Sequence, residues 1–381
     1  MSRIPLKYGV NPHQGNAAVI NDSAPLTVKN GQPGYINLLD ALTAWQLVME
    51  MKSATGKAAA ASFKHVSPAG AAIEKPLDEV FLRSQFLPVR DYSPVATAYA
   101  RARGGDRMCS FGDAVAVSEV VDVSLANLLK AEVSDLLIAP GFEPEALSIL
   151  KAKKGGNYLL LQMDPNYVPP AVERRELFGF TFEQDRNNAR IDASLFKGAP
   201  DDVVETLIVA TLALKYAQSN SVCVGYDGQV IGLGAGQQSR IHCTRLACDK
   251  AEKWMLQFHP AVLALDFKPG LKKPDRANIV DQFLLFDELS AAEQAEMQAG
   301  LGVLPTPLDA ETRRSWIGTF DMLCLSSDAY IPFRDNIDRA AKSNIRVIAH
   351  PGGSVRDEIV QSACDQYGIR LVETGVRCFL H

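Results

Sequence analysis

The chain has 381 residues, 47% of them hydrophobic and 22% charged, and its formal net charge is −5. This length exceeds one compact core of ordinary size, so we expect two lobes or more. The slight negative charge and the lack of a long basic run argue against nucleic-acid partners. No apolar stretch approaches a membrane span and the N-terminus lacks a signal-peptide core, so we expect a cytoplasmic protein without a membrane partner.

The seven cysteines are scattered along the chain. The closest pair, Cys243 and Cys248, fits no common zinc spacing, and we interpret all seven as reduced, mostly buried thiols. The sequence contains no His-x-Glu and no Pro-Cys-x-x-Cys, so the ligands of a zinc deaminase are missing. We expect no metal site.

The N-terminal stretch 6–14 combines polar, aromatic and turn-forming residues, and we expect it to be docked rather than frayed. The alternation in 16–28 is compatible with a strand. Asn37 then precedes a helical pattern of apolar residues, and it could be the N-cap of that helix.

The most informative stretch is 58–72. Its first part, Ala58 to Phe63, is small and apolar and predicts a buried strand or packed segment, after which Lys64 and His65 stand side by side before a predicted turn at 67–70. Near neutral pH a histidine can accept and return a proton, while a lysine stabilises developing negative charge. The alternative is a surface lysine beside a core histidine that caps a loop.

The rest of the first half predicts a layered α/β lobe, although 76–107 has only a weak pattern. Strands alternate with helices at a spacing typical of such lobes: a turn at 110–113, a strand at 114–117, a helix at 124–133, a strand at 134–139, a helix at 143–152 and a strand at 157–162.

Residues 164–200 lack a clear period and are interpreted as a connector between lobes. A helix is predicted at 202–217, followed by a hairpin whose turn is Asp227-Gly228. The glycine-rich run 232–238 lacks the pattern of a dinucleotide site and of a P-loop. We interpret it as a tight turn that lets the backbone approach a ligand and presents helix N–H groups.

The segment 246–318 predicts an all-helical insertion, and the α/β pattern then resumes: a strand at 321–325, a helix ending at 342, a strand at 347–349, a helix at 355–366 and a strand at 369–372. The segments around His65 and His350 are both strand-end turns, a faint echo that hints at two related lobes. The predicted domains are a first lobe at 1–165, a second lobe at 166–245 and 320–381, and a helical insertion at 246–319.

Five motifs in order give the chain a close resemblance to the AICAR transformylase family: 6–14, 62–72, 218–223, 234–246 and 326–336. The resemblance covers nearly the whole chain. It implies two cytidine-deaminase-like α/β lobes with a helical insertion, and transfer of the formyl group of 10-formyltetrahydrofolate to the 5-amino group of AICAR in purine synthesis. It also implies a homodimer with sites at the interface and no catalytic metal.

The usual bifunctional protein carries an IMP cyclohydrolase domain before the position of Leu6, so the chain resembles a stand-alone transformylase. A separate IMP cyclohydrolase is one potential partner. Among the catalytic residues that the resemblance implies, His65 is the base or proton shuttle for the substrate amine, and Lys64 stabilises the oxyanion. Asn220 hydrogen-bonds the carboxamide of the substrate and so orients the amine.

Two further sets of residues follow from the resemblance. For AICAR they are Lys7, Tyr8 and Arg377 at the phosphate, with Asn37, Gly112, Asp135, Arg240 and Tyr330 around the nucleotide. The family usually has arginine where Lys7 stands and commonly phenylalanine where Tyr330 stands, and lysine lacks the bidentate fork of arginine. For the folate they are Phe111, Ile241, Pro332, Phe333, Asp335, Ser354 and His381. Without the resemblance, Phe111, Ile241 and Phe333 would be core residues and Asp335 a helix cap.

Two rival functions fit the sequence less well. A deaminase or hydrolase on the same kind of fold is disfavoured by the missing zinc ligands. A non-catalytic folate- or nucleotide-binding relative is disfavoured by the presence of Lys64, His65 and Asn220.

Overall fold

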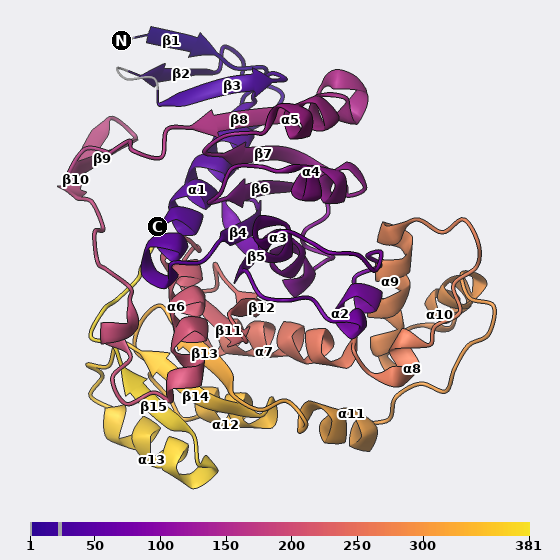
Figure 1. Cartoon of the computed structure of the whole chain (residues 1–381). Helices are drawn as coiled ribbons and strands as arrows, with labels where there is room; N and C mark the ends of the chain where they lie inside the picture. The colour runs from indigo at the N-terminus through magenta and orange to yellow at the C-terminus, as the bar shows by residue number, and fades with distance from the viewer. Residues whose placement is uncertain (1, 22–24) are drawn as a thin grey trace.

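The computed structural model describes residues 2–21 and 25–381 and is built on one mixed sheet of eleven strands (Figure 1). The strand order is β15-β14-β13-β11-β12-β5-β4-β6-β7-β8-β3. The strands of the first half are β3 (Leu26–Asn30), β4 (Ala59–Lys64), β5 (Ser67–Ile73), β6 (Asp113–Val117), β7 (Ser134–Ala139) and β8 (Leu159–Met163). Those of the second half are β11 (Val222–Tyr226), β12 (Gln229–Gly234), β13 (Leu323–Ser327), β14 (Ile345–His350) and β15 (Arg370–Glu373).

The two halves repeat one order of elements. The first runs through a helix, a hairpin and three parallel strands: α1 (Tyr35–Thr55), β4, β5, α3 (Pro94–Gly105), β6, α4 (Val123–Lys130), β7, α5 (Pro144–Lys151) and β8. The second does the same: α6 (Asp201–Lys215), β11, β12, α7 (Arg240–Leu256), β13, α12 (Asp335–Lys342), β14, α13 (Asp357–Tyr367) and β15. The halves meet where β5 runs antiparallel to β12.

This repetition does not match the sequence echo that hinted at it. His65 follows β4, whose counterpart in the second half is β11, whereas His350 ends β14, whose counterpart is β7. The two histidine segments are therefore not equivalent positions.

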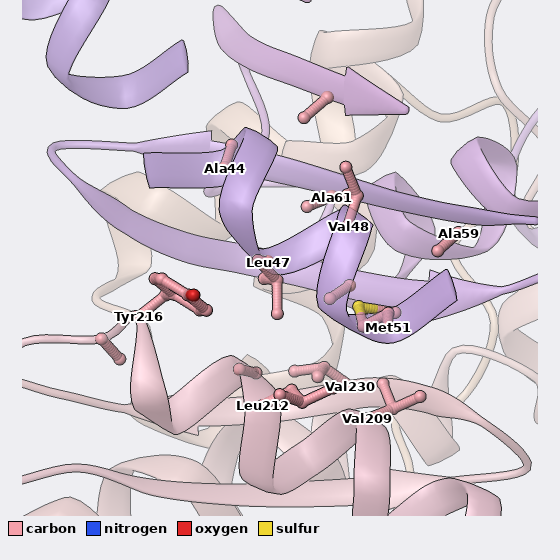
Figure 2. Close-up of a cluster of buried hydrophobic side chains, with 14 of the residues drawn as sticks. Ala44, Leu47, Val48, Met51, Ala59, Ala61, Val209, Leu212, Tyr216 and Val230 are labelled. Carbon is pink, nitrogen blue, oxygen red and sulfur yellow. The ribbon is translucent and has the colours of Figure 1, made fainter. Parts of the chain in front are cut away.

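Helices cover both faces of the sheet. The helices α1 and α6 lie against each other over one face at the seam, where Leu47 and Met51 of α1 face Val209 and Leu212 of α6 (Figure 2). The helices α3, α4, α5, α7, α12 and α13 contribute to the cores on the other face. The small residues of β4 alternate between the two cores, as a strand buried on both faces requires.

The glycine-rich run has a different role from the predicted one. Gly232 and Gly234 lie within β12, where an added Cβ would sit 2.1 Å from the Ala247 carbonyl oxygen and 2.3 Å from that of Cys243. These glycines therefore let α7 pack directly on the strand. The interpretation as a loop that approaches a ligand is wrong for this part of the run, because sequence spacing does not show which backbone comes close.

The predicted insertion is helical and lies beside the second half (Figure 1). It contains α8 (Pro260–Leu263), α9 (Lys273–Leu284), a 3-10 turn at Phe286–Glu288, α10 (Ala291–Ala299) and α11 (Ala310–Ile317), which join the core under α7. No helix among residues 2–21 and 25–381 is long and apolar enough to cross a bilayer.

Local structure differs from the expectations at four places. Asn37 is not the N-cap of α1: Gly34 is, and the Asn37 Oδ1 accepts from the Gly34 N–H at 2.9 Å from within the first turn. The chain reverses at His65 and Val66, and Ser67 already belongs to β5, because the hairpin loop has only two residues. The stretch 16–28, predicted as one strand, instead contributes to two strands, β2 (Ala18–Asn21) and β3. The strand β2 pairs with β1 (Ser2–Pro5), and residues 22–24 lie outside the described residues.

The fourth difference is the connector 164–200, which contains the hairpin of β9 (Val172–Leu177) and β10 (Phe180–Asp185) and a 3-10 turn at Ala193–Leu195. The hairpin projects from the body (Figure 1), and its residues are largely exposed, so no alternation of polarity marks it. The weakly patterned stretch 76–107 holds α2 (Glu79–Ser84) and α3; α3 is buried on all sides and therefore lacks an amphipathic period.

Candidate active site

Strand ends from both halves lie along one side of the sheet, here called the site edge. β4 ends there and β6 begins there, because Phe63 pairs with Ala114. β11 begins there too, since Val222 pairs with Ser327 at the end of β13. The antiparallel seam keeps both halves in this orientation, because β5 and β12 pair through Ala72 and Gln229 near the opposite edge.

The last residue of β4, Lys64, and the first residue of the turn that follows, His65, lie at the site edge. The Lys64 Nζ donates to the Phe111 carbonyl oxygen at 2.5 Å and lies 6.0 Å from the centroid of the Phe111 ring. His65 is exposed, and both His65 and Val66 have positive φ, 54° and 58°. A β-branched residue is rare in this region, so the turn is held against local strain.

The group that holds the turn is Asp40, which the sequence analysis missed. Asp40 lies in α1 and is 7% exposed, and its Oδ1 accepts the Val66 N–H at 2.6 Å. Burial raises the pKa of the Asp40 carboxyl, while the Val66 N–H and His65 partly offset that rise. The only signal in the sequence is a carboxylate on the apolar side of a helix, which calls for a partner.

The N-terminal segment docks beside this turn. The Lys7 N–H donates to the Pro33 carbonyl oxygen at 3.0 Å, and the Tyr8 hydroxyl donates to the Asn37 Oδ1 at 2.7 Å. Gly34 makes room for the Tyr8 ring, because a Cβ there would lie 2.1 Å from the ring. The Lys7 side chain is exposed, so its charge is available at the site edge.

Asp135, at the start of β7, belongs to the same group of residues. Its Oδ1 pairs with the Lys154 Nζ at 2.6 Å, and its carboxylate lies 3.8 Å from where a Cβ of Gly112 would be. Burial and then the charge of Asp135 raise the pKa of the Tyr8 hydroxyl, which stays protonated near neutral pH. Lys154 is a second residue that the sequence analysis did not propose.

A buried polar network supports the loop that carries Phe111 and Gly112. The Asp113 carboxylate accepts from the Ser62 Oγ at 2.8 Å and from the Arg103 Nη1 at 2.8 Å. The hydroxyl groups of Ser62 and Ser110 are also hydrogen-bonded to each other, with their Oγ atoms 2.8 Å apart. These bonds fix the loop from behind, on the side away from the site edge.

The second half contributes a separate group centred on Asn220, just before β11. The Asn220 Nδ2 donates to the carbonyl oxygens of Gln237 and Gln238, at 2.9 and 3.2 Å, and its Oδ1 accepts from the Arg240 Nη2 at 2.8 Å. Arg240 is 7% exposed and also pairs with Asp328. Arg240 therefore positions Asn220 from behind, and one acceptor lone pair of Oδ1 remains for a substrate donor.

The predicted folate residues divide between the halves. Phe111 of the first half is 46% exposed and Phe333 of the second half is 50% exposed, so neither is a core residue. Tyr330, which was predicted to contact AICAR, is 47% exposed. Pro332, Phe333 and Asp335 line an open cavity of about 320 Å³. Asp335 is the first residue of α12 and not its cap. Ile241 is half-buried at the start of α7.

The C-terminal residues lie beside Asn220. The Ser219 N–H donates to the Leu380 carbonyl oxygen at 3.0 Å, and the carbonyl oxygen of His381 accepts from Arg175 of β9 at 2.7 Å. Arg377 is exposed, and its guanidinium stacks on Phe379 at 4.8 Å from the ring centroid.

The two groups share the site edge, and none of their described residues is joined to the other group by a hydrogen bond or ion pair. Lys64 ends β4 and Asn220 precedes β11, and the strands β5 and β12 lie between these two strands. This is three strand spacings, or roughly 14 Å. Across residues 2–21 and 25–381 there is no group of three or more histidine, cysteine, aspartate or glutamate side chains arranged to hold a metal ion.

Fold and site together define a mixed α/β protein with a paired lysine and histidine at a strand-end turn and aromatic, cationic surroundings. The profile of the AICARFT/IMPCHase bienzyme family matches residues 2–250. The bifunctional purine biosynthesis protein PurH of Cereibacter sphaeroides (strain ATCC 17029) is 30% identical over 387 residues, and that of Roseobacter denitrificans is 29% identical over 389 residues. Both alignments cover 99% of this chain and 59% of the relative, so the chain spans about three-fifths of the length of these relatives. The chain belongs to the AICARFT/IMPCHase bienzyme family.

Proposed function

We propose that the chain transfers the formyl group of 10-formyltetrahydrofolate to the 5-amino group of AICAR, giving FAICAR and tetrahydrofolate in the purine pathway to IMP. The observation that carries this proposal is the Lys64–His65 turn, which places a cation and a proton acceptor together at the site edge. Membership of the family and the PurH name of the relatives support the choice of substrates.

In the proposed reaction the AICAR amine attacks the formyl carbon, and the carbonyl oxygen becomes negatively charged in the tetrahedral intermediate. His65 takes the proton that the amine loses and delivers it to N10 of the folate as the carbon–nitrogen bond to N10 breaks. Lys64 stabilises the oxyanion. Asn220 accepts a hydrogen bond from the AICAR carboxamide through its remaining lone pair, which orients the adjacent amine.

The remaining residues are assigned by their positions around these groups. Lys7, Tyr8 and Arg377 hold the phosphate. The residues that surround the nucleotide, or that position the residues around it, are Asn37, Gly112, Asp135, Arg240 and Tyr330. Phe111, Ile241, Pro332, Phe333, Asp335, Ser354 and His381 belong to the folate side.

We further propose a homodimer in which Lys64 and His65 of one chain face Asn220 of its partner. The support is the distance of roughly 14 Å across three strands, which exceeds what one carboxamide and its neighbouring amine can bridge. We also propose a cytoplasmic location, two cytidine-deaminase-like lobes and catalysis without a metal. The repeated order of elements in the two halves supports the proposed fold relationship.

The test is to incubate the protein with AICAR and 10-formyltetrahydrofolate and to follow tetrahydrofolate. His65→Ala should lower turnover by roughly 10²-fold or more, since a positioned proton-transfer group is lost, while AICAR binding is largely kept. A variant with near-wild-type turnover would remove His65 from the mechanism. Binding of both substrates without turnover by the wild-type chain would instead favour the non-catalytic relative.

A further inference from the structure

The cavity beside the start of α13 contains residues that the assignments above do not use. Its lining comprises Pro332, Phe333, Arg334, Asp335, Arg356 and Ile359. Three of these were predicted to contact the folate, whereas Arg334, Arg356 and Ile359 were not.

The two arginines differ in how they are engaged. The Arg334 Nη2 is 2.8 Å from the Asp338 Oδ1 and donates to the Gln366 Oε1 at 3.2 Å. The Arg356 guanidinium stacks on the Phe333 ring, with its Cζ 4.6 Å from the ring centroid, and it has no hydrogen-bond or ion-pair partner in residues 2–21 and 25–381. Arg356 is exposed, so its planar fork of donors is available to a ligand.

The nearby acids form no ion pair with this fork and accept instead from neutral amide groups. Asp335 accepts from the Asn336 Nδ2 at 2.9 Å, and Asp357 accepts from the N–H groups of Gly353 and Ser354 at 2.7 and 3.0 Å. The Arg356 N–H in turn donates to the Ser354 Oγ at 3.1 Å, which anchors the backbone under the guanidinium. The cavity therefore combines apolar lining residues with a positioned cation that has no ion-pair partner among the described residues.

We propose that this cavity binds the glutamate tail of the folate donor, with a tail carboxylate on Arg356. The inference rests on the proposed function and deepens it. The donor ends in a p-aminobenzoyl group followed by glutamate, so the aromatic amide matches Pro332, Phe333 and Ile359, and the carboxylates match the free fork. An arginine binds a carboxylate through two parallel hydrogen bonds, which a lysine does not reproduce. Arg356 thus discriminates glutamylated donors from donors that end at the benzoate.

The test compares two non-reactive probes, folic acid, which carries one glutamate, and pteroic acid, which carries none. Each is titrated into the wild-type protein and into Arg356→Ala, Arg356→Lys and Arg346→Ala. Arg346 is a matched control, because it is an exposed arginine near the other end of β14 from the loop that leads to Arg356. Arg356→Ala should weaken folic acid roughly three- to tenfold and leave pteroic acid unchanged. Arg356→Lys should lie between, and Arg346→Ala should match the wild type.

Kinetics provide the second readout. Arg356→Ala should raise the KM for 10-formyltetrahydrofolate by the same factor with little change in kcat, because the tail is remote from the transferred carbon. Equal weakening of both probes, or no weakening of folic acid, would overturn the assignment of Arg356. If the wild-type protein transfers no formyl group, the proposed function fails, and the folic acid titration still decides whether Arg356 binds the tail. Failure of the wild type to bind folic acid would overturn the assignment of Arg356, while the transfer assay alone decides the proposed function.

Discussion

At the scale of single residues, the strained turn of His65 and Val66 depends on one buried carboxylate. The Asp40 Oδ1 is the acceptor of the Val66 N–H, and the charge of Asp40 lies near His65. We infer that Asp40 is a positioning residue, since it acts on the turn and not on substrate.

Asp40→Ala should therefore lower kcat by roughly 10- to 100-fold, because a misplaced proton-transfer group is inefficient, while AICAR binding changes less. Asp40→Asn keeps an oxygen acceptor at the same place and should retain much more activity. Adding Val66→Gly to Asp40→Ala relieves the strain at position 66 and should restore part of the loss. Steady-state kinetics and AICAR binding titrations compare the three variants with the wild type. If Asp40→Ala and Asp40→Asn were both as active as the wild type, Asp40 would not position the turn.

A second prediction at this scale concerns Lys7, whose exposed side chain leaves its charge free for a phosphate. Lys7→Ala should weaken AICAR binding by about 1.5–3 kcal/mol, the worth of a hydrogen bond to a charged group. Lys7→Arg should hold or tighten it, because arginine adds a second parallel bond. The maximal rate should change less, since the phosphate is remote from the formyl group.

The control for Lys7 is the dephosphorylated nucleoside, titrated in parallel. Loss of affinity for the nucleotide alone supports a phosphate contact, and Arg377→Ala should act in the same direction and combine non-additively with Lys7→Ala. Equal loss for nucleotide and nucleoside would mean that Lys7 only docks the N-terminal segment, whose Lys7 N–H donates to the Pro33 carbonyl oxygen.

At the scale of elements, Glu132 connects the helical insertion to the first half. It follows α4, is 5% exposed, and accepts from Arg107 at 2.7 Å and from Lys273 of α9 at 2.8 Å. Burial alone would raise the pKa of the Glu132 carboxyl, but Arg107, Arg103 and Lys273 together lower it to about 2. The Glu132 carboxyl is therefore ionised in the folded protein.

Glu132→Gln should lower the free energy of unfolding at pH 7 by roughly 3–5 kcal/mol, because buried cations lose their anion. Since the folded pKa lies below the unfolded one, the stabilisation is present above about pH 4.5 and is lost as the pH falls toward 2. The difference between variant and wild type should therefore shrink in acid. Denaturant titrations across this range measure it, with Glu119→Gln as control, because Glu119 pairs with Lys52 at the surface. A constant difference at all pH values would contradict the linkage.

The elements show which parts of the structure a sequence can predict. The strands β6, β7 and β14 and the hairpin of β11 and β12 were predicted because buried strands read as apolar runs and Asp227-Gly228 marks a turn. The helix α3 and the hairpin of β9 and β10 were not, since one is buried on all sides and the other is exposed on both faces. Neither leaves a period of polarity to read.

The same limit applies to the site. Lys64 and His65 stand together in the sequence, so their chemistry could be proposed from it. Asp40 and Lys154 act through contacts that span 26 and 19 residues, and only the fold brings them to Val66 and Asp135. The free fork of Arg356 is likewise visible only once its stacking on Phe333 is known.

At the scale of the whole molecule, the repeated halves place two incomplete groups at one edge of a single sheet. Three strand spacings separate Lys64 from Asn220, and the proposed homodimer would bring the two groups of different chains together. Light scattering should accordingly give about twice the 41.4 kDa mass of the chain. The mass alone does not show whether the two chains share their active sites. Heterodimers of two different variants test this directly.

His65→Ala and Asn220→Ala should each be nearly inactive as homodimers. A heterodimer with one copy of each, purified through two different tags, should regain about half of wild-type activity, because one of its two sites combines wild-type His65 from one chain with wild-type Asn220 from the other. The matched control is the heterodimer of His65→Ala with Lys64→Ala. Both changes lie in the first group, so each of its sites keeps a defect and no activity should return. If the first heterodimer stays as inactive as its parents, His65 and Asn220 act within one chain, and the strand ends must approach each other on substrate binding.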